Sequence, residues 1–117
     1  MLGSTVAVVF ASLFFHPYGA VKAVKSLKPL LAGADVNPSV FAIAERSCKN
    51  CHSEGTEWPW YSYVAPMSWL IEGDVYIGRW HMNLSHWDEY RIDEKQLLLS
   101  EIAVMVRNRK MPLPRCL

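Results

Sequence analysis

The sequence has a net charge close to zero, few cysteines and no long apolar run. Each of these features excludes a class of protein. The formal net charge is +1, so no electrostatic basis exists for binding nucleic acid. Outside one Cys-x-x-Cys pair the only cysteine is Cys116, and the histidines offer only the poor pair His81/His86, so a four-ligand zinc site is incomplete. The apolar run at residues 6–15 is short for a membrane-spanning helix, which needs roughly 20 residues.

The stretch that carries chemistry is Cys48-Lys49-Asn50-Cys51-His52. Two cysteines three positions apart, with a histidine directly after the second, form the attachment pattern of a c-type haem. The thiols add to the vinyl groups of the porphyrin as thioethers, and the histidine supplies an imidazole nitrogen to the iron. The sequence therefore predicts one covalent haem c, attached through Cys48 and Cys51, with His52 as the proximal ligand. A thioredoxin-like pair is disfavoured because no βαβ pattern surrounds the motif.

Size and composition agree with a domain built around a flat aromatic group. About 80 residues follow position 37, near the size at which a single protein core is marginal, and a buried porphyrin would add apolar mass. Seven prolines and six glycines indicate a loop-rich domain. All five tryptophans lie between Trp58 and Trp87, just after the haem motif, although an ordinary aromatic core would give the same clustering.

The N-terminal part predicts export. Residues 6–15 are typical of the apolar region of a signal peptide, yet no lysine or arginine precedes them, while Lys22, Lys25 and Lys28 follow. This reverses the positive-inside expectation. Small residues at 32–34 resemble a cleavage site but lie far from the run. We interpret residues 1–20 as a signal or N-terminal membrane anchor, 21–36 as a tether, and 37–117 as the haem-binding domain, held at the periplasmic side of a bacterial inner membrane.

Residues that start and end helices indicate where the Cys-x-x-Cys-His motif lies in the fold. Asn37 followed by Pro38 predicts a helix start that delivers the chain into Cys48. A second helix is expected from Ser68 to about Arg79, another start at Ser85, and a last helix over residues 93–109. In that last helix the apolar positions recur at helical spacing and the end charges suit the helix dipole.

The distal iron ligand is predicted to be Met111. Residues 111–114, Met-Pro-Leu-Pro, are held extended by two prolines, and a thioether is a soft, neutral ligand that raises the reduction potential. A loop methionine packed on the core is the alternative interpretation. Two methionines and two histidines are rival ligands: Met67, Met82, His81 and His86.

The chain resembles a family, the bacterial haem-binding domain of small exported monohaem cytochromes, over about residues 38–115. Besides the Cys-x-x-Cys-His motif, the resemblance is carried by blocks along the chain: Thr56, Trp58-Pro59-Trp60-Tyr61-Ser62, Ala65-Pro66, Ser68-Trp69, Gly78-Arg79, Asn83, Ser85, Trp87 and Met111-Pro112-Leu113-Pro114. It implies an all-α, cytochrome c-like fold with few short helices and long loops around one covalent haem.

Family members usually continue past the methionine loop into a final helix, whereas this chain ends at Leu117. We therefore expect the closing C-terminal helix to be lacking. With Cys48 and Cys51 on haem, Cys116 is predicted to be a free thiol or part of an intermolecular disulfide. A homodimer would then form through Cys116 or through the uncovered helix face.

Aromatic and basic side chains after the motif are candidates for haem contact. Trp58, Trp60 and Tyr61 can cover a haem face or edge while their N–H and O–H groups reach propionates or water. Arg79 can pair with a propionate, although a solvated surface arginine is the alternative.

These observations predict an electron carrier. The expected function is one-electron transfer between redox partner proteins through a His/Met-ligated haem iron. No general base, nucleophile or substrate pocket is evident, so catalysis is not predicted beyond weak peroxidase-like activity. The alternatives are a haem-based sensor or ligand-binding module with an open or labile distal site, and an accessory to a periplasmic redox enzyme.

Overall fold

The computed structural model describes residues 1–116, and this part of the chain contains helices and loops but no strand. The all-α prediction is confirmed. The elements, in chain order, are α1 (Leu2–Ser12), η1 (Val21–Ala23), α2 (Pro38–Ser47), α3 (Lys49–His52), η2 (Trp60–Tyr63), α4 (Met67–His81), η3 (Leu84–Glu89), α5 (Ile92–Arg107) and η4 (Pro114–Cys116), where η marks a 3₁₀ helix.

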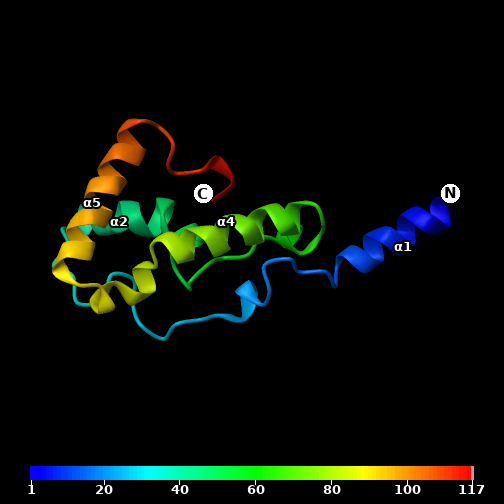
Figure 1. Cartoon of the computed structure of the whole chain (residues 1–117), viewed down its shortest axis with the longest axis horizontal. Coiled ribbons are helices and arrows are strands. Elements are labelled where there is room, and N and C mark those ends of the chain that lie inside the picture. The colour runs from blue at the N-terminus through cyan, green and yellow to red at the C-terminus, as the bar shows by residue number, and fades with distance from the viewer. Residues whose placement is uncertain (117) are drawn as a thin grey trace.

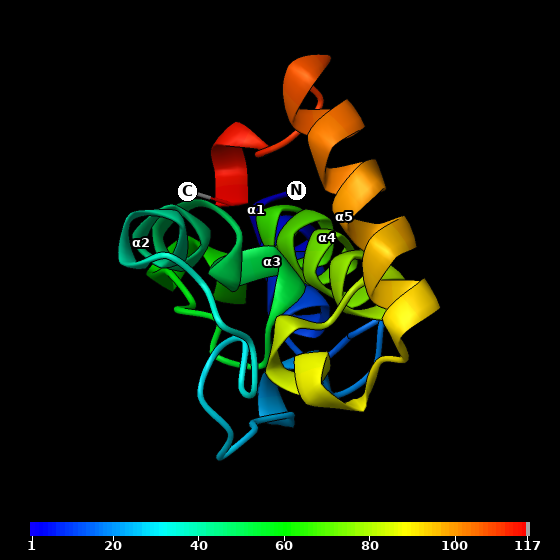
Figure 2. The same ribbon diagram turned by 90° about the vertical axis from the view of Figure 1, so that its left-hand side faces the viewer.

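Helix α4 is the axis of the domain (Figure 1). Seen end-on, α2 and α3 lie on one side of α4 and α5 lies on the other, while the C-terminal segment crosses between them over α4 (Figure 2). Helix α1 projects away from this arrangement. The segments before and after α4 in sequence therefore lie on opposite sides of this helix.

The ends of α2 and α5 follow from local chemistry. The Asn37 side chain accepts a hydrogen bond from the Ser39 N–H (2.9 Å), and Pro38 occupies the first helical position, which confirms the predicted start. Helix α5 begins at Ile92 and ends at Arg107, two residues before the predicted end. It ends there because Arg109 adopts a left-handed conformation (φ 56°) that an α-helix cannot continue.

Helix α4 lies so close to α3 that one position accepts only glycine. A Cβ atom built on Gly78 would lie 2.4 Å from the carbonyl oxygen of Cys51, a distance that no side chain tolerates against backbone. The helix start predicted at Ser85 is the short 3₁₀ helix η3 instead. Its cap is Asn83, whose side chain accepts a hydrogen bond from the Ser85 N–H (3.0 Å).

The segment before α2 packs against the domain, including part of residues 21–36, which were expected to be a tether. Val21 is buried in the core. The Lys22 ammonium donates to a carboxylate oxygen of Glu72 (2.7 Å) and to the carbonyl oxygen of Ser62 (2.5 Å). Glu72 is only 1% exposed, and the imidazole of His16 lies 3.1 Å from the same carboxylate. A buried carboxylate needs such a cation, so this segment contributes to the fold.

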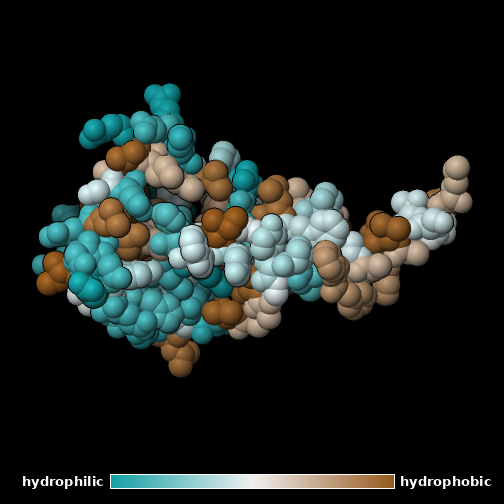
Figure 3. Space-filling view, in the orientation of Figure 1, coloured by the Kyte–Doolittle hydropathy of each residue, from teal (hydrophilic) through white to brown (hydrophobic). Residues whose placement is uncertain are grey.

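Helix α1 carries no buried residue. Figure 3 shows it as a largely hydrophobic projection beside a domain whose visible face is mostly hydrophilic. Among residues 1–116, no helix has both the length and the apolar character required to cross a membrane. The role of residues 1–20, which include α1, as a signal or anchor stays a prediction.

Candidate functional site

The Cys-x-x-Cys-His motif is folded as a tight helical turn. Helix α2 ends at Ser47, and Cys48 joins it to the one-turn helix α3. The His52 N–H donates to the Cys48 carbonyl (2.9 Å). Residues three apart on a helix lie on the same face, so the turn directs the two cysteines to one side.

Both cysteines and His52 line one cavity of about 460 Å³, which we call the central cavity. Its walls come from α2 and α3, from α4, from α5 and from the C-terminal segment, and most of the side chains are apolar. The lining residues are Ile43, Ser47, Cys48, Cys51, His52, Asp74, Ile77, Gly78, His81, Met82, Leu98, Glu101, Ile102, Met105, Val106, Met111, Pro112, Leu113 and Cys116. An apolar cavity with a few polar donors is the usual form of a cofactor site.

The orientation and protonation of the His52 imidazole suit metal binding. Its Nδ1 lies 3.0 Å from the carbonyl oxygen of Gly78 and 3.2 Å from that of Met82. Because carbonyl oxygens only accept hydrogen bonds, Nδ1 carries the proton and donates, and Nε2 keeps its lone pair. Burial lowers the pKa of His52, which favours the neutral form that binds metals.

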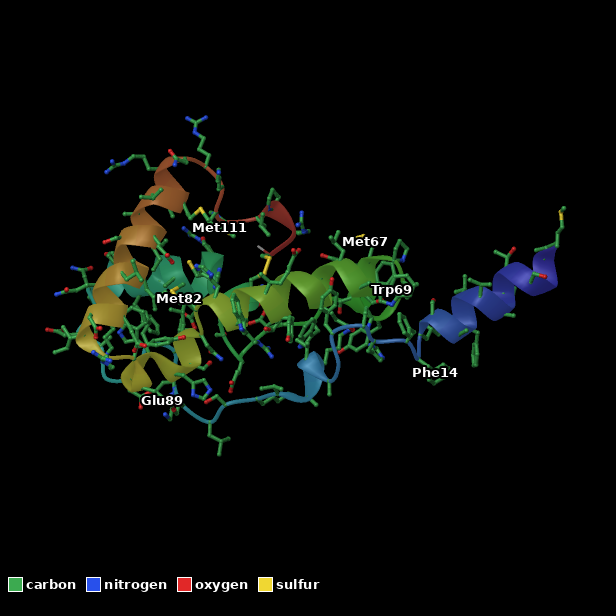
Figure 4. All side chains as sticks on the ribbon, viewed as in Figure 1. Phe14, Met67, Trp69, Met82, Glu89 and Met111 are labelled. Atoms are coloured by element: carbon green, nitrogen blue, oxygen red, sulfur yellow. A yellow bond between two sulfur atoms is a disulfide. The ribbon has the colours of Figure 1, made fainter. Side chains whose placement is uncertain are left out.

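The candidate distal ligands separate into two groups. Met111, Met82 and His81 line the central cavity. Met67 does not, and Figure 4 shows it with Trp69 at the opposite end of α4 from Met82 and Met111. His86 also lies outside the cavity lining, where its ring nitrogens are hydrogen-bonded to Glu54 (2.7 Å) and Glu89 (2.9 Å).

The three cysteines differ in state. Cys48 is a free thiol, and burial raises its pKa. Cys51 and Cys116 form a disulfide with a Cα–Cα distance of 6.0 Å. In this state Cys116 is therefore neither a free thiol nor part of an intermolecular disulfide, and the expectation for the chain with haem on Cys48 and Cys51 stays a prediction. The two cysteines are 65 residues apart in the sequence, so no local signal indicated that they pair. They meet because η4 brings the end of the chain back against α3.

The aromatic candidates lie away from the central cavity. Trp58 and Tyr61 line a second cavity of about 750 Å³, the side cavity, together with charged side chains such as Glu45 and Arg115. Trp60 lines neither cavity and is 79% exposed. Contact of these three residues with a cofactor stays a prediction.

The Arg79 side chain is hydrogen-bonded to groups of the protein itself. Its guanidinium donates to the carbonyl oxygens of Ser53 (2.7 Å) and Val21 (2.9 Å) and to the hydroxyl of Thr56 (2.9 Å). These bonds join the loop after the haem motif, helix α4 and the N-terminal segment. Arg79 thus positions the loop that follows His52, and its pairing with a propionate stays a prediction.

Three residues of the cavity were missed in the sequence. Gly78 provides both the close approach of α4 and a hydrogen-bond acceptor for His52, and in the sequence it stood out as a glycine inside a predicted helix and as part of the family resemblance. Met105 lines the cavity and is 38% exposed, although it lies in the last helix, where the apolar spacing predicts only a core-facing side. Glu101 places a carboxylate at the cavity wall and binds the imidazole of His81 (2.9 Å).

Comparison with known proteins decides the class of cofactor. A family model described as "Haem-binding domain" matches residues 7–117. The chain belongs to this haem-binding domain family. The match confirms the resemblance and extends it to the N-terminal segment that packs on α4. No curated protein and no solved structure matches the chain significantly.

The central cavity of this haem-binding protein fits haem by its chemistry. It offers a neutral imidazole with one nitrogen held by carbonyl groups, a thiol at Cys48, thioether donors and an apolar wall. These are the groups that hold haem iron and its apolar macrocycle in proteins. A thioether at Cys51 would additionally require the bond to Cys116 to open.

Proposed function

We propose that the protein is a monohaem c-type cytochrome that transfers single electrons between redox partner proteins. Cys48 and Cys51 would hold the haem in the central cavity, and His52 would bind the iron through Nε2. When bound, the haem supplies one-electron chemistry between ferric and ferrous iron. The observation that carries the proposal is the pair of hydrogen bonds from His52 Nδ1 to Gly78 and Met82, since it fixes the ligand before metal arrives.

Met111 is the proposed distal ligand. It is the first residue of the C-terminal segment that closes the cavity, and its neighbours Pro112 and Leu113 also line the wall. The Met111 backbone N–H donates to the Met105 carbonyl (3.3 Å), which ties the segment to the end of α5. A neutral thioether would favour ferrous iron and raise the potential.

A ligand-binding or sensor function is the second candidate. Met82, Met105 and His81 line the same cavity as Met111, so several side chains compete for one coordination position. A distal position with exchangeable ligands is open to small exogenous ligands. In both cases we propose no catalytic role beyond weak peroxidase-like activity of exposed iron.

We further propose that the domain works at the periplasmic side of a bacterial inner membrane, as a free exported protein or held by residues 1–20. Two arguments support this location. Helix α1 is apolar and carries no buried residue, and the attachment of haem c needs an export-linked system. Haem-loaded chain in the cytoplasm in equal amount to exported chain would contradict this location.

The first prediction concerns the covalent bond. Haem should stay with the exported protein in acid acetone, and Cys48→Ala or Cys51→Ala should each weaken this retention because each removes one thioether. Absorbance of the extracted and residual fractions measures it. Met67→Ala is the control, since it keeps Cys48, Cys51 and Cys116 and lies outside the lining of the central cavity. Complete extraction from the unsubstituted protein would disprove covalent linkage.

The second prediction concerns Met111. Met111→Ala should remove the near-infrared sulfur-to-iron charge-transfer band of the ferric protein and lower the reduction potential, because a neutral sulfur donor is lost. Met67→Ala is the control and should leave the band in place, since Met67 lies outside the cavity. An unchanged band in Met111→Ala, together with its loss in Met82→Leu, would transfer the role to Met82.

A further inference from the structure

The disulfide between Cys51 and Cys116 stands in the wall between the two cavities. Both residues line the central cavity and also the side cavity. Each is 7% exposed, and both belong to one core cluster with Val21, Ile71 and Val75. The bond therefore joins the end of the chain to the haem motif within a packed environment, while Cys48 stays a thiol in the central cavity.

This arrangement commits one thiol of the haem motif to a partner outside the motif. We propose that Cys116 protects Cys51 in the haem-free chain, and that a dithiol must open the Cys51–Cys116 disulfide before the second thioether can form. The inference rests on the proposed attachment of haem to Cys48 and Cys51. It adds a function for Cys116, namely a removable covalent cap on one haem-binding thiol.

The chemistry balances in two steps. A thiolate of the dithiol attacks one sulfur of the disulfide, the other sulfur leaves as a thiolate, and the second thiol of the reductant resolves the mixed disulfide. Cys51 and Cys116 together gain two electrons and two protons, and the reductant becomes a disulfide. The Cys51 thiol then adds across a vinyl group: a carbon–sulfur bond replaces the carbon–carbon π bond, the thiol hydrogen moves to the other vinyl carbon, and Cys116 remains a thiol.

Protection has a physical basis in the position of Cys48. It lies one helical turn from Cys51, where the two thiols of the motif would readily join under oxidising conditions. Pairing with Cys116 removes Cys51 from that reaction. In this proposal the capped state persists until an external dithiol reaches it.

The cap also holds the proposed distal loop in place. Cys116 ends η4, directly after the segment that carries Met111. A second restraint comes from Arg115, whose guanidinium is bidentate to the carboxylate of Asp74 on α4. Opening the disulfide leaves this ion pair intact, so Cys51 can be released while the C-terminal segment remains at the cavity wall.

The first test maps the thiols of the haem-free chain. Full-length protein is oxidised with oxidised glutathione, alkylated in denaturant and digested, and the peptides are identified by mass spectrometry. We expect alkylated Cys48 and a linked Cys51–Cys116 peptide pair. In Cys116→Ala the same treatment should yield the Cys48–Cys51 disulfide. A Cys48–Cys51 bond with free Cys116 in the unsubstituted chain would overturn the proposal, and this result does not depend on haem or on folding of the variant.

The second test adds ferrous haem to the oxidised chain with and without dithiothreitol. Pyridine haemochrome spectra distinguish haem with one reacted vinyl group from haem with two. Without dithiothreitol we expect loss of the second thioether, and with it both should form. Arg115→Ala is the matched control: it lacks the ion pair to Asp74 but retains Cys116, so its requirement for dithiothreitol should persist. Cys116→Ala, kept reduced and freed of reductant under anaerobic conditions, should need none.

The outcomes separate this inference from the proposed function. Two thioethers forming in the oxidised chain without dithiothreitol would overturn the protecting role and leave the cytochrome proposal intact. Failure of the fully reduced chain to take covalent haem would contradict the cytochrome proposal, whereas the peptide map would still report whether Cys116 pairs with Cys51.

Discussion

His52→Ala is expected to abolish the low-spin spectrum of the haem-loaded protein, the largest spectroscopic effect of any single substitution in the central cavity. The thioethers would still retain the haem, but the iron would lose the imidazole that the carbonyl groups of Gly78 and Met82 hold in a fixed orientation. Electron paramagnetic resonance of the ferric protein measures the change. We expect high-spin signals and rapid binding of carbon monoxide after reduction.

Two further histidines provide controls for this result. His86→Ala should leave the low-spin signal unchanged, because its imidazole is engaged by Glu54 and Glu89 outside the cavity lining. His81→Ala removes a histidine that does line the cavity. If His52→Ala remained low-spin and the His52→Ala/His81→Ala double variant did not, His81 would be the ligand, and our assignment would be wrong.

Gly78→Ala should lower the free energy of unfolding by about 3 kcal/mol, at the upper end of the usual cost of overpacking. The added methyl would meet the Cys51 carbonyl oxygen at 2.4 Å and its carbon at 3.1 Å, and neither backbone atom can rotate away. Helix α4 has to shift from α3. Since the Gly78 carbonyl accepts the hydrogen bond from His52, haem affinity should fall as well. Urea unfolding and haem titration measure the two effects.

Gly55→Ala is the matched control for that experiment. A Cβ atom there would lie 3.5 Å from its nearest neighbour, the Ser53 hydroxyl, which is an ordinary contact. We expect a change in unfolding free energy within about 0.5 kcal/mol, the usual range for surface substitutions. Equal losses in Gly78→Ala and Gly55→Ala would show that glycine flexibility, and not the close approach of two helices, explains the effect.

Local signals were sufficient for the starts of the longer helices, but not for the start predicted at Ser85, which is the 3₁₀ helix η3. Asn37 and Pro38 specify a helix start through one side-chain hydrogen bond and one fixed φ angle, and neither depends on distant residues. The spacing of Cys48, Cys51 and His52 likewise places three groups on one turn. Such features can be predicted because their physical causes act within four or five residues of chain.

Long-range contacts could not be predicted in the same way. Nothing near Cys116 in the sequence indicates that η4 returns to α3, and nothing near Arg79 indicates that Val21 is one of its acceptors. The tryptophans illustrate the same limit: their clustering in sequence agreed with packing around a flat aromatic group, but Trp58 lines the side cavity and Trp60 is 79% exposed. Each outcome depends on how α4 packs against segments that lie far away in the chain.

The ion pair between Lys22 and Glu72 constrains how the polypeptide can be trimmed after synthesis. A peptidase that cut at the small residues 32–34 would detach the segment containing Val21 and Lys22. Glu72, 1% exposed, would then be an anion without a counter-ion, and breaking a buried ion pair in this way costs about 3–5 kcal/mol. A peptidase site that preserves this ion pair therefore lies upstream of Val21. If the chain were cut later, the released fragment would have to stay bound as a second, non-covalent chain.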